Sequence, residues 1–421
     1  MKVLMLSSYH AKGGAARAAS RLASALPAAG VTVDYRSIYA RHMTPVQKLA
    51  YYWRVAHDRL PAYWRARRRI MFSAGSLGNA DLVRQINASD ADLVHLHWIN
   101  GGALAVEDLN RINKPMVWTL HDMWAFTGGC HYDAGCGRFT QGCGACPQLN
   151  SEHAQDLSYR SATAKAVTYR RATNLTIIAV SRWMAEGARQ SRAMSGLPIV
   201  TLPNLIDTQQ FRPADRQQAR THLGLPASGK IIVFGADAAV VDPRKGYQHM
   251  LAALALLPVV MRENIELAVF GSASVGPALE HGFRVHHYGR VGDEQLNHLY
   301  NAADVMVVPS IQEAFGQTAL EAMACATPVV AFATTGLLDI VDHQRNGFLA
   351  RAFEPASLAE GICWVLEHND PPTLRRAARQ KVLDCFNSCA VALRYRQLYE
   401  RCLDLKPSEE PGALSVRTHS A

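Results

Sequence analysis

The sequence predicts an α/β protein with two Rossmann-like halves, and three observations lead to this prediction. Short apolar segments of strand length, about ten in all, alternate with longer amphipathic segments, which is the order typical of parallel sheets covered by helices. The chain opens on an apolar strand at 2–8 that leads to a glycine turn at Gly13 and Gly14, as a Rossmann-like half does. A second apolar strand at 230–235 opens another half, after a segment at 199–207 that closes the first.

The same patterns give the expected elements and domain boundaries. Strands are expected at 2–8, 31–35, 91–98, 116–124, 175–180, 230–235, 266–271, 285–291 and 304–308. Helices are expected at 13–28, 153–171 and 214–223, and several more at 355–403. We therefore expect a first domain at 1–207, a second at 208–388, a helix at 389–403 that packs back on the first domain, and a disordered tail at 404–421.

The composition indicates an ordinary globular protein. Of the 421 residues, 49% are hydrophobic and 19% are charged, which suffices for a sizeable core under a polar surface. No run of 18 apolar residues occurs, and the N-terminus enters a strand at once, so we expect neither a membrane span nor a secretion signal. The expected location is the cytoplasm.

The net charge of +9 is concentrated in the first half. Residues 1–207 hold 24 Lys and Arg against 13 Asp and Glu, whereas the remainder holds 20 against 22. The surplus centres on the segment 51–72, in which arginines, four of them at 65–69, alternate with Trp and Tyr. Such a segment fits an interfacial helix on the anionic inner face of the cell membrane. The alternative is an ordinary helix with a solvated basic face. No nucleic-acid motif accompanies the segment, so no nucleic-acid partner is expected.

The most informative stretch is an apolar strand at 304–308 that breaks at Pro309 and enters a helix near Gly316. Unpaired N–H groups and the helix dipole make such an opening favourable for a diphosphate. Glu313 lies before the turn and Glu321 about two turns into the helix, and carboxylates accept hydrogen bonds from hydroxyls. We interpret Glu313 as a partner of a transferred sugar and Glu321 as a partner of a ribose. The alternative is that Glu313 caps the helix and Glu321 is a solvated helix position.

The string that begins at Glu313 is Glu-Ala-Phe-Gly-Gln-Thr-Ala-Leu-Glu-Ala-Met-Ala, followed by Cys-Ala-Thr-Pro-Val-Val-Ala. It closely resembles the donor-site signature of retaining GT-B glycosyltransferases of family 4, and the resemblance spans nearly the whole chain. It implies two facing Rossmann-like domains with an active-site cleft between them. It also implies transfer of a sugar, with retention, from a nucleotide-diphosphate sugar to a hydroxyl of a lipid-linked saccharide. The donor-binding residues implied in this string are Glu313, Phe315, Gly316, Gln317, Thr318 and Glu321.

Two adjacent cations, Arg244 and Lys245, precede a glycine at a helix start. Cations placed there can neutralise a diphosphate leaving group, and the alternative is a solvated basic turn. Lys245 and Gly246 resemble the Lys-Gly motif of the family. The family's arginine lies a few residues earlier, where this chain has Ala-Val-Val at 239–241, so Arg244 is expected to replace it.

The strand at 116–124 carries His121 at its C-terminal end, the edge at which ligands bind in open α/β sheets. Its Thr-Leu-His-Asp sequence resembles the family pattern in which this histidine contacts the transferred sugar. Asp122 is expected to orient the His121 ring. His95 and His97 alternate with apolar residues and are interpreted as structural or acceptor-side groups.

The resemblance assigns roles to five further residues. Gly13 and Gly14 would let the backbone approach the donor phosphate and the acceptor closely. Asn204 lies in a Pro-Asn-x-Ile-Asp segment similar to the family's interdomain crossing and is expected to line the cleft. Arg290 and Val291 follow a strand similar to one that packs near the nucleotide base.

Four of the nine cysteines, Cys130, Cys136, Cys143 and Cys146, fall within one glycine-rich segment. Clustered thiols in a reducing compartment argue against stable disulfides. Cys143 and Cys146 have the spacing of a zinc knuckle, so the sequence predicts either a structural zinc site with four cysteine ligands or free thiols. A similar loop occurs in family 4 enzymes that resemble colanic-acid and other exopolysaccharide glycosyltransferases.

These observations together predict a retaining hexosyltransferase of exopolysaccharide, lipopolysaccharide or other cell-surface polysaccharide synthesis. Catalysis is expected to need no metal, because no Asp-x-Asp motif stands where a divalent ion would bridge the diphosphate. No carboxylate nucleophile stands out, so we expect a front-face mechanism assisted by the leaving phosphate, with Lys245, Glu313 and His121 as catalytic residues. The alternatives are a nucleotide-sugar epimerase or phosphorylase on the same fold, and a non-catalytic zinc-bearing module on anionic membranes.

Overall fold

The computed structural model describes residues 1–10, 13–39, 43–63, 71–235, 242–271, 282–368 and 373–404. The chain forms two compact units, which are described separately. The first comprises Met1–Pro203 together with the chain from Ala392, and the second comprises Asn204–Val391. None of the helices within these ranges combines the length and the apolar character needed to span a membrane.

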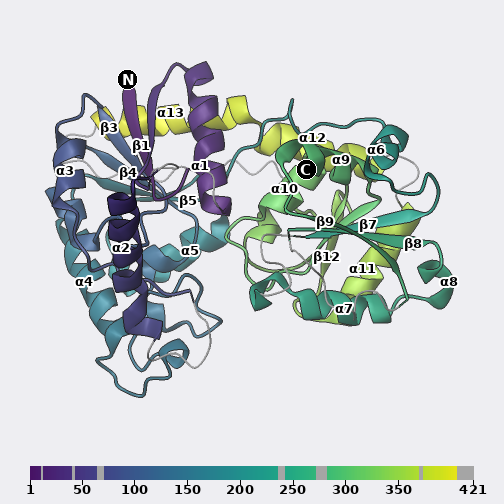
Figure 1. Ribbon diagram of the computed structural model, residues 1–421, viewed down its shortest axis with the longest axis horizontal. Coiled ribbons are helices and arrows are strands. Elements are labelled where there is room, and N and C mark those ends of the chain that lie inside the picture. The colour runs from purple at the N-terminus through teal and green to yellow at the C-terminus, as the bar shows by residue number, and fades with distance from the viewer. Residues whose placement is uncertain are drawn as a thin grey trace. The chain divides into compact units, whose positions relative to one another are not determined.

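The first unit is built on a parallel six-stranded sheet with the order β2-β1-β3-β4-β5-β6 (Figure 1). Its strands are β1 Lys2–Ser7, β2 Thr32–Ser37, β3 Leu93–Leu96, β4 Met116–Leu120, β5 Leu175–Ala179 and β6 Ile199–Thr201. Every residue of β3, β4 and β5 is buried, because helices cover both faces of a parallel sheet and leave its inner strands apolar throughout.

The helices of this unit are α1 Gly14–Ala25, α2 Pro45–Tyr63, α3 Ala80–Asn87, α4 Leu157–Arg171 and α5 Arg182–Gln190. The end of α1 and the start of α4 differ from the bounds expected from the sequence. α1 gives way to a 3-10 turn at Leu26–Ala29, where Pro27 occupies the first turn. α4 begins at Leu157 rather than near 153, because Asp156 caps it by accepting the Ser158 N–H at 2.9 Å.

The second unit contains another parallel six-stranded sheet, with the order β12-β11-β10-β7-β8-β9. Its strands are β7 Lys230–Gly235, β8 Ile265–Phe270, β9 Arg284–Gly289, β10 Val305–Val308, β11 Val329–Phe332 and β12 Gly347–Ala350. Two Rossmann-like units are therefore confirmed. The last two strands were not expected individually, since short apolar runs such as 329–332 resemble buried helix segments.

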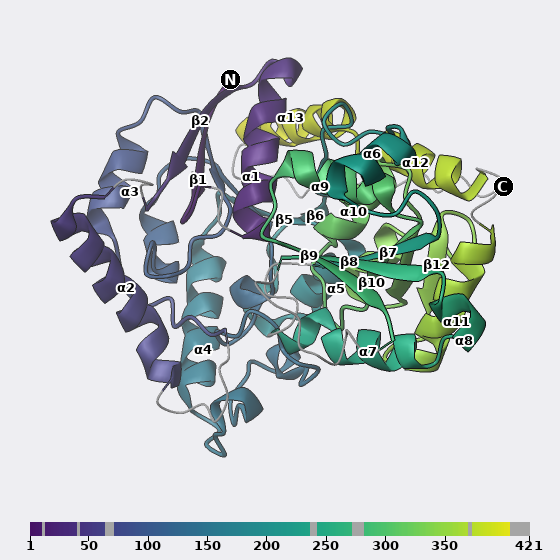
Figure 2. The same cartoon turned by 45° about the vertical axis from the view of Figure 1, so that its right-hand side comes forward.

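The helices of the second unit are α6 Arg216–Leu223, α7 Tyr247–Ala255, α8 Val259–Arg262, α9 Asp293–Ala302, α10 Gln317–Ala324, α11 Pro355–His368 and α12 Thr373–Cys385. Apolar side chains of the central strands form one core with α7 and α11. Figure 2 shows α6, α9 and α12 on the other side of this sheet. The final helix, α13 Ser388–Asp404, returns the chain to the first unit, where Tyr399 bonds His95 and Arg396 bonds the Ala29 carbonyl.

Parallel strands place all their carboxyl ends at one edge of a sheet, and ligands bind outside that edge. In the first unit the segments that follow β1, β3 and β4 meet there. In the second unit the same edge receives the segments that follow β7, β10 and β11. The predicted functional residues of each unit lie mostly on these segments.

Candidate active site

Two loops of the second unit lie against each other at the carboxyl edge of its sheet. The first follows β7 and contains a 3-10 turn, Pro243–Lys245; the second follows β10. Gly246 permits this approach, because its φ is +71° and a Cβ atom there would lie 1.8 Å from the carbonyl oxygen of Pro309. The Ile311 N–H also donates to the Arg244 carbonyl at 2.7 Å. A glycine is therefore required at this position for the two loops to meet.

This contact brings Lys245 and Glu313 together. The Lys245 Nζ lies 2.5 Å from Glu313 Oε1, and the Ser310 hydroxyl donates to the same oxygen at 3.0 Å. The Glu313 backbone is fixed as well, since its N–H donates to Thr335 Oγ1 and its carbonyl accepts the Gly336 N–H, both at 3.0 Å. The two charged side chains are 20% and 14% exposed. The alternative of a solvated basic turn is wrong for Lys245.

The opening of α10 lies directly after Glu313. Gly316 is the N-cap of the helix, with φ +114°, and as a glycine it has no side chain that could accept an N–H group of the first turn. A Cβ atom at Gly316 would lie 2.8 Å from Leu337 Cδ2. The alternative that Glu313 caps the helix is wrong, because its carboxylate is engaged by Lys245. Gln317 and Thr318, both half-buried, form the first turn, whose backbone N–H groups suit an anion.

Glu321 differs from Glu313 in its surroundings. Its side chain is 1% exposed, and Tyr300 donates its hydroxyl to Oε2 at 3.0 Å. The alternative of a solvated helix position is therefore wrong. The expected contact between Glu321 and a ribose hydroxyl stays a prediction.

The remaining predicted donor residues vary in exposure. The Arg244 guanidinium donates two hydrogen bonds to Asp242, with Nη2 lying 2.5 Å from Oδ2, and the Arg244 backbone N–H donates a third at 3.0 Å. Residues 239–241, where the family carries its arginine, lie outside the described residues. Phe315 is 2% exposed and packs edge-to-face on Phe386, so it supports the loop from beneath. After β9, Arg290 is exposed and Val291 half-buried.

In the first unit, His121 follows β4 and is partly exposed. Its Nε2 lies 2.9 Å from Nδ1 of His97, which follows β3. The sequence predicts that Asp122 orients this ring, but the carboxylate of Asp122 bonds other residues instead. It accepts hydrogen bonds from His131 Nδ1 at 2.6 Å and from Trp98 Nε1 at 2.9 Å. Sequence analysis missed this arrangement, although the residues following adjacent parallel strands are neighbours at the sheet edge.

Burial determines the charge of the histidines in this unit. It lowers the pKa of His121 to about 4, against a smaller opposing effect of Asp122. It also lowers the pKa of His95 to about 3 and that of His97 well below its usual value. All three rings are therefore neutral near pH 7.

Gly13 caps α1 with φ +88°, and a Cβ atom at Gly13 or Gly14 would have no heavy atom of the described residues within 4 Å. Both positions thus leave space beside the backbone. Asn204 is the first residue of the second unit and is 8% exposed. The roles expected for these three residues stay predictions.

Cys130, Cys136, Cys143 and Cys146 are all free thiols. Cys130 and Cys146 are buried in a small core with Phe72, and burial raises the pKa of the Cys143 thiol to about 11. Within the described ranges, no three His, Cys, Asp or Glu side chains are placed to hold a metal ion. The structure thus gives the zinc site no support, and that site stays a prediction for metal analysis.

An aromatic cluster at the carboxyl edge of the first sheet was also missed by sequence analysis. The ring centroid of Tyr9 lies 5.9 Å from that of Tyr39 and 5.6 Å from that of Trp98, and the Tyr9 and Tyr51 hydroxyls are 3.2 Å apart. Tyr9, Tyr39 and Trp98 each lie within two residues of a strand end, which was the available signal. Such rings offer a ligand flat apolar faces with polar edges.

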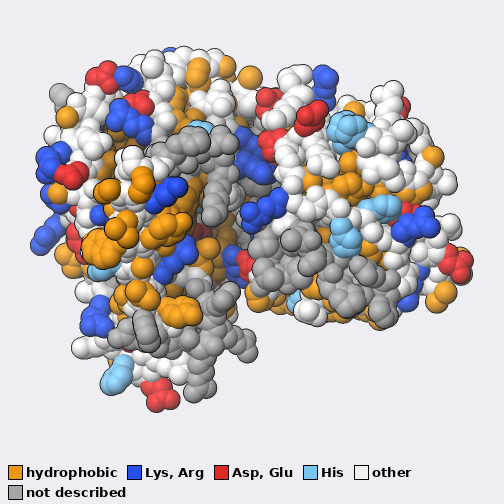
Figure 3. Space-filling model, viewed as in Figure 1, with side chains coloured by type: hydrophobic (Ala, Val, Ile, Leu, Met, Phe, Trp, Pro, Cys, Tyr) orange, Lys and Arg blue, Asp and Glu red, His pale blue; other side chains and the backbone are white. Residues whose placement is uncertain are grey.

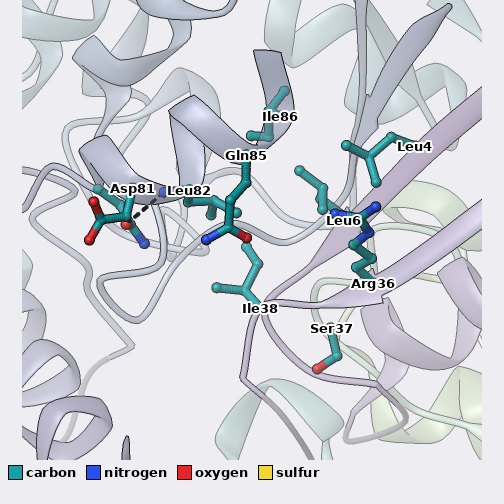
Figure 4. A pocket seen from close by; sticks show the side chains of 10 residues that line it. Leu4, Leu6, Arg36, Ser37, Ile38, Asp81, Leu82, Gln85 and Ile86 are labelled. Atoms are coloured by element: carbon teal, nitrogen blue, oxygen red, sulfur yellow. Dashed lines mark hydrogen bonds between the residues drawn. The ribbon is translucent and has the colours of Figure 1, made fainter. Parts of the chain in front are cut away.

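A separate cavity of about 200 Å³ lies between the first sheet and α3 (Figure 4). Figure 4 shows the Gln85 amide directed toward Ile38. The cation in the lining, Arg36, is paired with Asp34 at 2.5 Å. None of the predicted site residues lines this cavity.

α2 exposes apolar side chains to solvent, and Figure 3 shows hydrophobic side chains gathered over it. The exposed residues are Val46 (77%), Leu49 (73%), Tyr52 (65%), Trp53 (57%), Leu60 (43%) and Tyr63 (68%). At 100° per residue they share one side of the helix, about 120° wide. The opposite side is held by Asp58, which is 1% exposed and accepts the N–H groups of Gly75 and Gly101 at 2.8 and 3.0 Å. Residues 64–70 of the predicted interfacial segment lie outside the described residues.

Two family models match the chain in succession. Residues 12–210 match the model described as Glycosyltransferase Family 4, and residues 215–381 match the model described as Glycosyl transferases group 1. D-inositol 3-phosphate glycosyltransferase of Streptomyces avermitilis is 30% identical over 319 residues, which cover 70% of this chain and 62% of the relative. D-inositol 3-phosphate glycosyltransferase 2 of Catenulispora acidiphila is 33% identical over 178 residues, which cover 38% and 41%. The chain thus spans 41% and 62% of the length of these two curated relatives.

Solved structures of three proteins resemble the chain over nearly its full length. Sucrose-phosphate synthase from Thermosynechococcus elongatus has a TM-score of 0.65 at 23% identity, covering 95% of this chain and 99% of that one. Anabaena HepE in complex with UDP-glucose scores 0.61 at 19%, covering 95% and 100%. WaaG, a glycosyltransferase involved in lipopolysaccharide biosynthesis, scores 0.60 at 19%, covering 94% and 99%. These likenesses show the GT-B fold, while the two family models match the first part of the chain to glycosyltransferase family 4 and the second part to the group 1 glycosyl transferases.

Proposed function

We propose that this protein transfers a sugar, with retention, from a nucleotide-diphosphate sugar to a hydroxyl of a lipid-linked saccharide in exopolysaccharide or other cell-surface polysaccharide synthesis. The observation that carries the proposal is the Lys245–Glu313 contact beside the opening of α10 at Gly316. A cation and the N–H groups at a helix start favour a diphosphate, and the adjacent carboxylate accepts hydrogen bonds from sugar hydroxyls. The family supports a transferase rather than an epimerase on the same fold.

Lys245, Glu313 and His121 each have a distinct role in this proposal. Lys245 and the first N–H groups of α10 stabilise the charge that develops on the departing diphosphate. Glu313 accepts hydrogen bonds from the transferred sugar, and His121 orients that sugar. No residue is assigned as a covalent nucleophile, so the leaving phosphate assists attack by the acceptor hydroxyl on the same face of the sugar.

The donor can be tested by incubating the full chain with a panel of UDP- and GDP-sugars and measuring thermal shift and transfer to saccharide acceptors. One nucleotide-sugar is expected to raise the melting temperature and to serve as donor, with retention of the anomeric configuration read by NMR. Release of a free epimerised nucleotide-sugar without acceptor would support an epimerase instead. Absence of any shift across the panel would contradict the proposed donor site.

The proposal includes docking on an anionic membrane through the exposed side of α2. Trp53 and Tyr63 suit the headgroup region, and Leu49 and Leu60 suit the acyl boundary. Lys48 and Arg59, both exposed, border the apolar side of the helix and complement anionic lipid. An ordinary helix would bury its apolar face and expose only its basic face. The exposed apolar residues of α2 therefore argue against that alternative.

Substitution of Leu49→Glu with Trp53→Glu is expected to lower co-sedimentation with phosphatidylglycerol vesicles by at least about tenfold, because two carboxylates would enter the anionic interface. Val259→Glu with Val260→Glu is a matched control, since these α8 residues are 68% and 78% exposed in the second unit. The control should sediment as the parent protein does. Equal binding by the α2 variant would contradict docking through this helix.

A further inference from the structure

Three histidines form a row beneath the carboxyl edge of the first sheet. Both nitrogens of His95 have partners, since Nδ1 lies 2.8 Å from the Tyr399 hydroxyl and Nε2 lies 2.7 Å from Thr119 Oγ1. The next ring, His97, packs against His95 with the centroids 4.1 Å apart and the ring planes tilted by 33°. His97 Nδ1 then lies 2.9 Å from His121 Nε2, and these two rings are 20° from parallel. Only His121 among the three is partly exposed.

One proton lies between the facing nitrogens of His97 and His121. A neutral imidazole has one donor nitrogen and one acceptor nitrogen. Because both rings have a lowered pKa and are neutral near pH 7, one of the two facing nitrogens carries the hydrogen and the other accepts it. The position of this proton determines which nitrogen of His121 is left to meet a ligand, and whether it donates or accepts.

Either His97 Nδ1 or His121 Nε2 donates in this contact, and the surroundings of His97 Nε2 indicate which one does. His97 is 2% exposed, and its Nε2 has no hydrogen-bond partner among the described residues. If His121 donated, the His97 proton would sit on Nε2 as an orphaned buried N–H, which is rare and costly in proteins. If His97 donates from Nδ1, its Nε2 is a bare acceptor nitrogen, and no buried donor is left unpaired.

We propose that His97 is a positioning residue that holds His121 in the tautomer with its proton on Nδ1, so that His121 presents an N–H donor. Within the proposed function, on which this role rests, the donor meets a hydroxyl or ring oxygen of the transferred sugar. His121 in this tautomer can only donate, so it selects an acceptor oxygen of its ligand. His121 is also excluded as a general base near pH 7, because Nε2 already accepts from His97.

The tautomer can be observed directly in the full chain labelled with ¹⁵N-histidine, by long-range ¹H–¹⁵N correlation. The His121 resonance is assigned among the 17 histidines by its loss in His121→Gln. The expected pattern is a neutral ring protonated on Nδ1. A ring protonated on Nε2, or one that exchanges between both forms, would overturn the inference even if sugar transfer is established.

Two variants connect the tautomer to activity. His97→Phe keeps a flat ring without a donor and is expected to mix the His121 tautomers and to lower kcat by about tenfold or more with little change in KM. His97→Asn retains an N–H near the former Nδ1 and should keep kcat within about threefold. Tyr399→Phe, which removes a partner of His95 only, should leave the His121 tautomer unchanged.

These outcomes separate this inference from the proposed function. An Nδ1–H tautomer in a protein that accepts no nucleotide-sugar would refute the function and leave the tautomer standing. Equal kcat for His97→Phe and the parent, in an active and folded protein, would refute the positioning role. If His97→Phe does not fold, the spectrum of the parent protein decides the question.

Discussion

Replacement of Glu313 by glutamine is expected to lower kcat for sugar transfer by at least about 100-fold, with a smaller change in KM. Glutamine keeps the size of the side chain and can still accept from Ser310, whose hydroxyl is 3.0 Å from Oε1. It loses the charge that strengthens hydrogen bonds from sugar hydroxyls, and it removes the counter-ion of Lys245, 2.5 Å away. Alanine should abolish transfer without unfolding the protein.

The measurement is a steady-state comparison of the parent, Glu313→Gln and Glu313→Ala, with melting temperatures recorded in parallel. Glu354→Gln is a suitable control, because this carboxylate lies in the same unit, pairs with Arg351 at 2.6 Å and is 54% exposed. It should change kcat less than about twofold. Transfer at the parent rate by Glu313→Gln would show that this carboxylate does not contact the sugar.

The sequence predicted both members of the central pair but not their contact. Lys245 and Glu313 were each singled out by motif, 68 residues apart. Their approach depends on a tertiary feature, the packing of Gly246 against the Pro309 carbonyl, which no periodic pattern reveals. Glu321 was assigned by the same motif, yet its burial under Tyr300 follows from how α10 packs and could not be inferred from spacing.

The first unit was predicted less well in its side-chain contacts. Strands β3 and β4 were expected, but their register was not, so the partner of His121 was assigned as its chain neighbour Asp122. The register places Leu96 beside Trp118, so His97 is level with Thr119 and contacts His121, two residues further along, diagonally. The side chains of sequence neighbours such as His121 and Asp122 point to opposite faces of a sheet. The side chains of His97 and His121, which follow adjacent strands, contact each other instead. Register depends on the whole sheet and is not encoded locally.

Replacement of Lys245 by methionine is expected to lower kcat about 100-fold or more and to weaken binding of the nucleoside diphosphate released by the active donor. The ammonium is a point charge at the loop that faces the opening of α10, and methionine keeps its length without its charge. Because Lys245 and Glu313 are in contact, the double variant Lys245→Met with Glu313→Gln should lose less than the product of the two single losses.

Diphosphate affinity, measured by calorimetry on the full chain, separates binding from chemistry in this series. Lys381→Met is the matched control, since Lys381 lies in the same unit, is 23% exposed and pairs with Asp342 at 3.1 Å. It should keep both kcat and diphosphate affinity. If Lys245→Met also kept both, the leaving group would not lie at the β7 and β10 loops. If the losses of the double variant were multiplicative, the two side chains would act independently despite their contact.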